Sequence, residues 1–304
     1  MELHFKSLPK LLDYFKDNTT CIEFLEQQRW GKTPICPFCR SKQIYRTNRG
    51  FKCKECTKKF SVTVGTIFEN SKIKLTTWFA ALYLCTANKK GVSSLQLHRD
   101  LGVTQKTAWF MEHRIREMLR AKHSPLLKGT VQADETFMGG KNKNRHADKK
   151  VEGSQGRSVK DKTPILGLAN DGKVNLEVVP NTQAETLKPI IIHLVKKGSV
   201  VVTDEWGGYS GLDKNYDHKV IKHNEGEYKK DSYHTNSIEG FWALLKRGIF
   251  GIYHYASPQH LTRYCDEFSY RYNTRDIDDS DRFMVSLTRV NGRLTYKQLT
   301  KKRE

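Results

Sequence analysis

The chain has 304 residues, which is enough for two or three domains, and it carries 53 Lys and Arg against 33 Asp and Glu. Its formal net charge of +20 and its pI near 9.6 favour a polyanionic partner, nucleic acid before an anionic membrane. No apolar run approaches the roughly 20 residues of a membrane span, and the N-terminal sequence lacks the apolar core of a signal peptide, so we expect an intracellular protein.

Residues 1–30 have apolar side chains at helical spacing and predict two short helices. Their composition suggests no chemistry, and we interpret them as a support for the segment that follows. Three isolated cysteines, Cys21, Cys85 and Cys265, stand in apolar surroundings. We expect them to be small buried hydrophobic residues rather than catalytic ones.

Four further cysteines form the most specific local pattern, CPFC and CKEC with thirteen residues between them. Each CxxC turn presents two thiolates to one ion, so Cys36, Cys39, Cys53 and Cys56 are predicted to close one tetrahedral Zn(II) site. Because the protein fills all four positions, this zinc is structural. The same segment carries six Lys and Arg against one acid, which favours contact with DNA phosphates, although zinc ribbons also dock proteins.

Residues 70–120 are predicted to be helical, with a helix-turn-helix pattern in their second half. Ser93 or Ser94 can cap a helix, Gly102 provides a tight turn and Thr104 can cap a second helix. The exposed N-terminal end of that second helix is the part of a recognition helix that meets base edges. It consists of Gln105, Lys106 and Thr107. A plain helical hairpin is the alternative interpretation.

From residue 129 onward the chain changes to short β-like runs. A capping box from Thr182 to Glu185 predicts a helix that continues to Leu194. The order strand, strand, strand, helix, strand indicates a mixed sheet flanked by helices. The predicted strands are 129–138, 164–169, 174–179 and 200–203.

Between the first two of these strands lies a strongly basic segment, residues 141–162, with eight Lys and Arg against three acids. Its low apolar content predicts a mobile loop. Such a run is often only solvated surface, but this one leaves directly from the strand of Asp134. We therefore expect a DNA-gripping loop, with contacts from Lys141, Lys143 and Arg145.

Two helices are predicted near the C-terminal end. In residues 234–250 an apolar stripe runs from Ile238 to Ile249 at helical spacing, with Glu239 and Lys246 on its flank. A further helix is predicted over 257–272. The basic segment 289–304 is expected to be loosely ordered.

Three carboxylates stand where a metal site could form. Asp134 lies in a predicted strand, Asp204 ends an apolar run and Glu239 lies on the later helix. Two Mg(II) or Mn(II) ions about 3.5–4 Å apart neutralise a phosphate and activate an attacking oxygen in phosphoryl transfer on DNA, and such ions prefer oxygen ligands. Lys246 is predicted to hold a phosphate nearby, and Asn236 to be a secondary ligand or a substrate contact.

The motifs resemble those of bacterial and archaeal insertion-sequence transposases of the zinc-ribbon DDE type. The resemblance runs from about Trp30 to His260. The matching motifs are CPFC with CKEC, LGVTQKTAWFMEHRIREML, ADETFMGGK, VVTDEWGGY and HTNSIEGFWALLKRGIFGIYH. It implies a ribonuclease-H-like catalytic domain that nicks the ends of the element, whose freed 3′-hydroxyl attacks target DNA. By motif position the first two acids fall on Asp134 and Asp204. In this family the third ligand is described as either an asparagine or a glutamate. The matching residues here are Asn236 and Glu239, and we favour Glu239.

The combined prediction is an α+β multidomain enzyme, a metal-dependent DNA transposase acting in the cytoplasm at a prokaryotic nucleoid. Its predicted partners are the terminal inverted repeats of the element and target DNA, without a membrane, and acting on two ends suggests a homodimer or larger synaptic complex. Two rivals stay open, a domesticated DNA-binding protein with the same fold and a nuclease of that fold. The predicted segments are the N-terminal helices with the zinc ribbon, the helix-turn-helix region, the ribonuclease-H-like domain and a basic tail, at residues 1–62, 63–125, 126–275 and 276–304.

Overall fold

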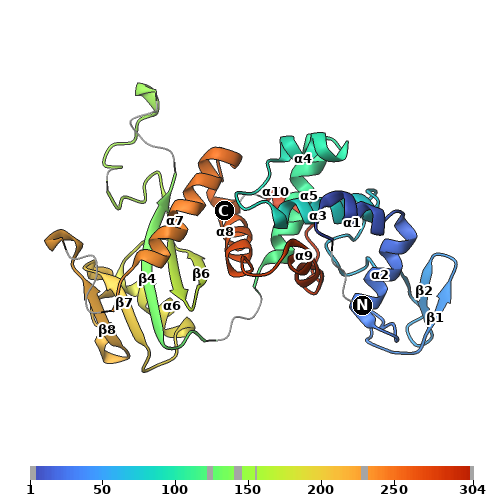
Figure 1. Cartoon of the computed structure of the whole chain (residues 1–304), viewed down its shortest axis with the longest axis horizontal. Coiled ribbons are helices and arrows are strands. Elements are labelled where there is room, and N and C mark those ends of the chain that lie inside the picture. Colours follow the sequence, from blue (N-terminus) through green and yellow to red (C-terminus); the bar gives the residue numbers. More distant parts are fainter. Residues whose placement is uncertain (1–4, 122–125, 140–145, 155, 227–231, 302–304) are drawn as a thin grey trace. The chain divides into compact units, whose positions relative to one another are not determined.

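The chain forms two compact units, and the computed structural model describes residues 5–121, 126–139, 146–154, 156–226 and 232–301 (Figure 1). The first unit, here called the ribbon unit, joins Met1–Arg120 to Thr274–Glu304. The second unit, here called the sheet unit, spans Ala121–Asn273. No helix in the described part of the chain is long and apolar enough to cross a membrane.

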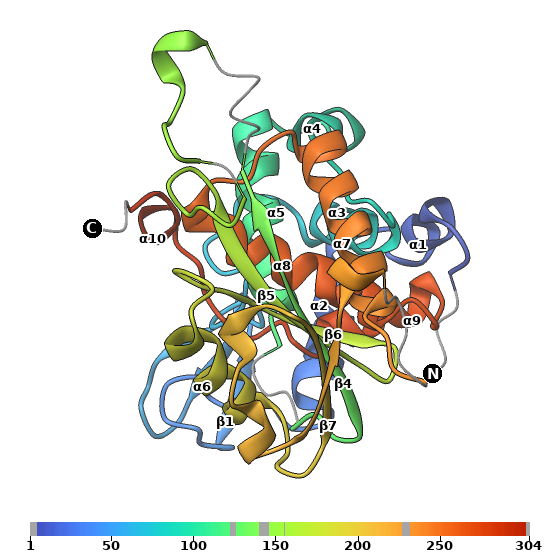
Figure 2. The ribbon, with the colours of Figure 1, turned by 90° about the vertical axis from the view of Figure 1, so that its left-hand side faces the viewer.

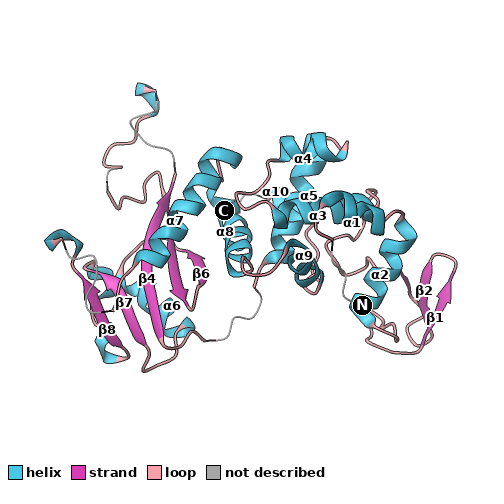
Figure 3. Ribbon diagram, viewed as in Figure 1, coloured by secondary structure: helices cyan, strands magenta, loops and turns pink. Residues whose placement is uncertain are grey.

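The ribbon unit is mainly helical, with one small three-stranded sheet (Figure 3). Phe79 makes edge-to-face contacts with Phe15, which directly follows the helix Leu8–Tyr14, and with Phe283 of the helix Asp279–Leu287, with ring centroids 4.8 and 5.6 Å apart. Its elements are α1 (Leu8–Tyr14), α2 (Asn18–Trp30), β1 (Ile44–Thr47), β2 (Gly50–Cys53), β3 (Lys59–Phe60), α3 (Leu75–Ala87), α4 (Ser94–Leu101), α5 (Gln105–Leu119), α9 (Asp279–Leu287) and α10 (Tyr296–Thr300).

The C-terminal segment is an ordered part of the ribbon unit instead of the loosely ordered tail expected from its charge. Within residues 289–304, the segment for which loose order was expected, the side chains of Val290, Leu294 and Leu299 are buried. The amide of Ile67 donates to the carbonyl of Val290. The basic composition of residues 289–304 did not reveal these apolar positions, of which Leu299 lies on α10 and faces the core.

The sheet unit contains a five-stranded mixed sheet in the order β6-β5-β4-β7-β8. The strands β4, β5 and β6 are antiparallel neighbours, whereas β7 runs parallel to β4 and β8 parallel to β7. Because the sequence pattern gave no signal for β8, this edge strand was not predicted. The elements are β4 (Thr130–Met138), β5 (Thr163–Asn170), β6 (Lys173–Val178), α6 (Ala184–Leu194), β7 (Val200–Asp204), β8 (Asp217–Ile221), α7 (Asn236–Gly248) and α8 (Pro258–Asn273).

Helices cover both faces of this sheet (Figure 2). Side chains alternate along a strand, so Ile165 of β5 packs with α7 and α8 while the adjacent Leu166 packs with α6. The strand β4 lies in the middle of this sheet, with antiparallel strands on one side and parallel strands on the other. This mixed sheet flanked by helices confirms the predicted α+β class and its ribonuclease-H-like catalytic fold.

The start of α6 differs from the sequence prediction. The helix begins at Ala184 after Gln183, whose side chain makes no capping hydrogen bond, so the predicted Thr182–Glu185 capping box is wrong. The carbonyl of Thr182 instead accepts a hydrogen bond of 2.8 Å from the indole of Trp206. A long-range contact has therefore replaced the local one.

Candidate active site

Asp134 and Asp204 lie on adjacent parallel strands at the same end of the sheet. The register pairs Gln132 of β4 with Val202 of β7, and each aspartate stands two residues further along its strand. Asp134 is on the face covered by α7, whereas the next side chain, Glu135, points to the opposite face and accepts a hydrogen bond from Tyr209. Sheet pairing therefore brings together two acids that are 70 positions apart.

The helix α7 is fixed to β4 by two sets of hydrogen bonds. The indole of Trp242 donates to Oδ2 of Asp134 at 2.8 Å. The side-chain oxygen of Gln132 accepts the amides of Ser237 and Ile238 at 3.1 and 3.2 Å, which satisfies two donors in the first turn of the helix. These contacts hold the helix that carries Glu239 against the strand that carries Asp134.

Gly167 of β5 makes room for the Trp242 contact. It is paired with Asp134 in the sheet, and a Cβ atom at this position would lie 2.5 Å from the Trp242 ring and 2.7 Å from Ile238. Since real Cβ atoms do not approach other heavy atoms so closely, a larger residue would push α7 away from the sheet. The glycine allows the indole to cross β5 and reach the carboxylate.

The carboxyl group of Asp134 has a pKa raised from 3.8 to about 6. Burial is the largest cause, because it disfavours the charged form, and repulsion from Asp204 and Glu239 adds to it. The Trp242 hydrogen bond and the charge of Arg157 act in the opposite direction. Asp204 and Glu239 therefore lie close enough to Asp134 to contribute to the rise of its pKa.

Removal of the indole donor tests this arrangement. Trp242→Phe is expected to raise the pKa of Asp134 further, by about one unit, because the charged carboxylate loses its hydrogen bond. A carboxyl carbon NMR titration of the metal-free protein measures the change. Trp78→Phe is the control, since it removes another buried indole, one that donates to Ser71 in the ribbon unit. An unchanged Asp134 titration in Trp242→Phe would contradict the assigned role.

Glu239 lies in the first turn of α7 and is more exposed than Asp134. Its Oε1 accepts a hydrogen bond from Thr235 and lies 3.7 Å from Nε2 of His223. Asn236, the first residue of the helix, is exposed, and Lys246 is half-buried in the last turn. Both lie on the same helix as Glu239, which leaves the identity of the third ligand a prediction.

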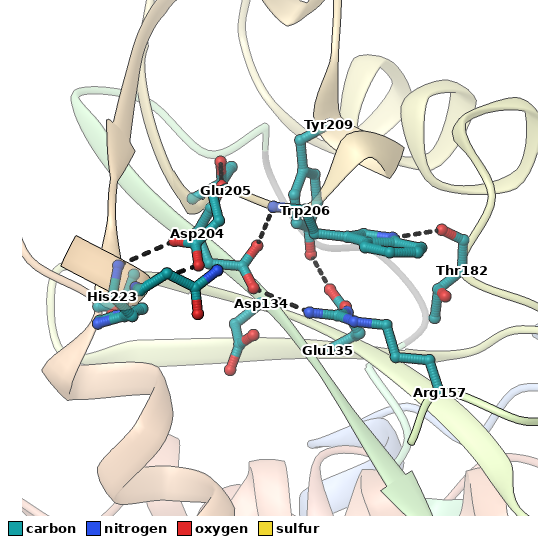
Figure 4. Close-up of polar contacts among 12 residues, drawn as sticks. Asp134, Glu135, Arg157, Thr182, Asp204, Glu205, Trp206, Tyr209 and His223 are labelled. Atoms are coloured by element: carbon teal, nitrogen blue, oxygen red, sulfur yellow. Dashed lines mark hydrogen bonds and ion pairs between the residues drawn. The ribbon is translucent and has the colours of Figure 1, made fainter. Parts of the chain in front are cut away.

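Arg157 belongs to this site although no sequence pattern predicted it. Its guanidinium pairs with Glu135 and with Oδ2 of Asp204, the latter at 3.0 Å, and it lies 4.3 Å from the centre of the Trp206 ring (Figure 4). Arg157 stands in the basic segment that was predicted to grip DNA, where a single arginine has no distinguishing pattern. It supplies a positive charge between Glu135, in the middle of β4, and Asp204, at the end of β7.

The side chain of Glu205, the residue after Asp204, binds backbone amides outside the acidic site. Its carboxylate accepts the amides of His223 and Asn224 at 2.9 and 3.3 Å, which ties the end of β7 to the turn after β8 (Figure 4). Asp204 itself accepts the amide of Trp206 at 3.0 Å. The two adjacent acids therefore have different hydrogen-bond partners.

The four cysteines predicted to hold zinc come together in the ribbon unit. Their sulfur atoms all lie within 4.8 Å of one another, and the Cys36–Cys56 and Cys39–Cys53 pairs are each 3.6 Å apart. Zn–S bonds of about 2.3 Å in a tetrahedron place sulfurs at comparable distances, so the donor set fits a structural Zn(II). Among the described residues, the oxygen atoms of Asp134, Asp204 and Glu239 do not form a comparably close group. The ligand atoms around two ions that share a bridging carboxylate lie further apart than the ligand atoms around a single ion.

The helix-turn-helix pattern forms as the caps predicted. Ser93 caps α4, Gly102 adopts a left-handed conformation with φ of 64°, and the Thr104 hydroxyl accepts the amide of Thr107 at 3.2 Å. At the start of α5, the residues Gln105 and Lys106 are exposed and Thr107 is half-buried. The Gln105 side chain donates to Ser94, and the Lys106 ammonium lies 5.1 Å from the ring of Tyr296. Of the other predicted DNA contacts, Lys141, Lys143 and Arg145 lie outside the described residues.

Comparison with known proteins identifies both units. Residues 126–273 match the model of the ISXO2-like transposase domain, and residues 16–59 match the transposase zinc-ribbon domain. The chain is 28% identical over 274 residues to an uncharacterized protein in transposable element ISH50 of Halobacterium salinarum, covering 84% of this chain and 91% of that protein. It is 34% identical over 106 residues to an uncharacterized transposase-like protein of Haemophilus influenzae, covering 34% and 85%.

Among solved structures, the Mos1 transposase paired-end complex with left transposon end aligns with 13% identity and a TM-score of 0.21, over 67% of this chain and 78% of that one. The sequence matches span the zinc ribbon and the sheet unit that holds Asp134, Asp204 and Glu239. The chain therefore belongs to the insertion-sequence DDE transposases with an N-terminal zinc ribbon.

Proposed function

We propose that this transposase cleaves the ends of its insertion sequence and joins the freed 3′-hydroxyl to target DNA by two-metal phosphoryl transfer. The observation that carries the proposal is the placement of Asp134 and Asp204 on adjacent parallel strands, with Glu239 close enough to raise the Asp134 pKa. Three mutually repelling carboxylates at one end of a sheet are costly without a cation, and divalent cations relieve that repulsion.

The residues fit Mg(II) or Mn(II). Asp134, Asp204 and Glu239 offer only oxygen ligands, which these ions prefer. When bound, the two ions would neutralise the scissile phosphate and activate the attacking oxygen. Within this proposal Asp134 and Asp204 hold the ions, Glu239 or Asn236 completes the set, and Lys246 holds a DNA phosphate beside it. The Trp242 hydrogen bond keeps the Asp134 carboxylate in one orientation.

The ribbon unit is proposed to recognise DNA. Gln105, Lys106 and Thr107 start α5 after the Gly102 turn, where side chains of a recognition helix reach base edges. The basic ribbon and the segment 141–162, with Lys141, Lys143 and Arg145, are proposed to contact phosphates of the terminal inverted repeats or of target DNA. Since two ends must be brought together, the active species is proposed to be a homodimer or a larger complex.

The test is a cleavage and joining assay. The purified full chain is incubated with labelled DNA carrying the native element ends, with and without Mg(II) or Mn(II), and with a target plasmid. We expect nicks at the element ends and joined products that require the divalent ion, and neither product from Asp204→Ala. DNA binding without cleavage by the wild type would favour a domesticated DNA-binding protein, while cleavage without end specificity or joining would favour a nuclease.

The third ligand is tested by comparing two substitutions on α7. Glu239→Gln is expected to reduce single-turnover cleavage at least about a hundredfold, because it removes a negative charge from the metal site. Asn236→Ala is expected to reduce it by less than about tenfold, since a neutral secondary ligand is replaceable by water. The opposite order, with the asparagine substitution abolishing cleavage, would assign the ligand to Asn236.

A further inference from the structure

A strained turn follows α7 in the sheet unit. The helix continues into a wider π turn (Ile249–Tyr253), and His254 then has φ of 61° and ψ of −39°. The amide of Tyr255 donates to the carbonyl of Tyr253 at 2.7 Å. A hydrogen bond across one residue with positive φ defines a γ-turn of the rare, strained type. A histidine in that conformation persists only where the surrounding packing imposes it.

The packing that imposes the turn comes from α8. The Tyr253 hydroxyl donates to Glu267 at 2.5 Å, and its ring lies 4.9 Å from that of Tyr264. Ile249 is buried in the core between the sheet and this helix. These contacts hold the Tyr253 side chain against α8. The chain reverses at His254, and the following side chain, Tyr255, is exposed to solvent.

Two large aromatic side chains are exposed in this region, Phe250 within the π turn and Tyr255 directly after His254. Tyr255 is 65% exposed, the highest value for a large apolar or aromatic side chain in the described part of the chain, and Phe250 is 48% exposed. Exposing such area costs roughly 25 cal/mol per Å² relative to burial. A strained turn that increases the exposure of an aromatic ring does not serve the stability of the fold, which points to a binding role.

The surrounding charge indicates the kind of partner. Residues 240–265 contain Lys246, Arg247 and Arg263 and no aspartate or glutamate. These cations lie close in sequence to Phe250 and Tyr255. Exposed aromatic rings and cations together bind unpaired nucleic acid, because bases stack on aromatic side chains and phosphates pair with Lys or Arg. Trp242, which contacts Asp134, lies eight residues before Phe250, and at 1.5 Å per residue this is about 12 Å along the helix, a span of a few nucleotides.

We propose that Phe250 and Tyr255 form a stacking surface for bases of an unpaired DNA strand next to the reacting phosphate. Here the surface formed by these two rings, with Arg247 as its cation, is called the aromatic surface. The proposal rests on the proposed function, since it names unpaired DNA at the end being processed as the ligand of this surface. The duplex beyond that end is bound elsewhere.

The test uses element-end duplexes with a short unpaired 3′ overhang containing 2-aminopurine, whose fluorescence falls when it stacks on an aromatic ring. The full chain is titrated without any divalent ion. We expect the wild type to quench the probe and to bind the overhang DNA more tightly than blunt DNA. Tyr255→Leu and Phe250→Leu are each expected to weaken overhang binding about tenfold, with little change for blunt DNA, and Tyr255→Phe is expected to keep wild-type binding.

Ile192→Ala is the matched control, because Ile192 is 50% exposed on α6 of the same unit. Equal losses on blunt and overhang DNA, or no loss in either leucine variant, would overturn the proposal. A change in sedimentation of these variants without a change in quenching would assign the surface to a second copy of the chain. Because no ion is present, this result is independent of whether the wild type cleaves DNA.

Discussion

Asp134→Asn is expected to make the metal-free protein more stable while lowering DNA cleavage by about a thousandfold, which is ~4 kcal/mol of transition-state stabilisation. Asparagine has the same shape and still accepts the Trp242 hydrogen bond, but it lacks the negative charge that a divalent ion requires. Single-turnover cleavage of element-end DNA measures the first effect, and denaturant unfolding in the presence of a chelator measures the second.

The sign of the stability effect follows from the Asp134 pKa, which is raised from 3.8 to about 6 on folding. Because the folded state holds this proton more tightly, stability contributed by the protonated acid is lost as the pH rises from about 4 to about 6. The difference of about two pKa units corresponds to about 3 kcal/mol at pH 7. The asparagine variant avoids this cost, and its advantage should disappear below about pH 4.

Asp213→Asn provides the control, since Asp213 is exposed on the same unit. It is expected to change neither cleavage nor stability measurably. Retained cleavage in Asp134→Asn would contradict the metal-ligand role. A loss of cleavage accompanied by lower stability would instead indicate that asparagine disturbs the packing of α7.

Cys53→Ser is expected to remove zinc from the ribbon and to unfold residues 36–60 locally. Cys53 is fully buried, and the three strands around it are two to four residues long. Sheets of this size are marginal by themselves, whereas structural Zn(II) sites in small domains contribute roughly 10–16 kcal/mol of binding free energy at neutral pH. We therefore expect loss of the bound metal and a loss of several kcal/mol from this segment.

Metal content by elemental analysis and proteolysis within residues 36–60 measure these effects. Cys21→Ser is the matched control, because Cys21 is also buried but lies outside the four-cysteine cluster. It should keep one zinc per chain and resist proteolysis. Full zinc content in Cys53→Ser would show that the remaining three ligands suffice and would contradict the prediction.

Local sequence patterns predicted the parts of this protein whose causes are local. The CxxC spacing brings two thiolates close together, so the sequence predicted the four zinc ligands. Their sulfur atoms lie within 4.8 Å of one another. The Gly102 turn and the Thr104 cap act over a few residues and appear where expected. Periodicity likewise located four strands of the large sheet and the helices α7 and α8.

Motif position predicted Asp134 and Asp204 as two acids of one site, with Glu239 favoured over Asn236 as the third ligand, and the sheet register gives a physical reason for the first pair. The roles of these residues stay predictions until the substitutions are measured. The sequence could not supply the order β6-β5-β4-β7-β8, because strand pairing depends on contacts between segments far apart in the chain. It also missed β8, an edge strand without a clear apolar alternation.

The tertiary structure alone decided which side chains support the site. Trp242 reaches Asp134 across 108 positions and depends on the absence of a side chain at Gly167. Arg157 contacts Asp204 from a segment whose only sequence feature is its basic charge. Phe283 is buried in the core although it lies in a strongly charged C-terminal segment. The sequence by itself therefore determined the zinc ligands, the caps of α4 and α5 and the acidic candidates. Long-range packing decided which other residues hold these side chains in place, because the free energy of packing comes from contacts that no local sequence pattern encodes.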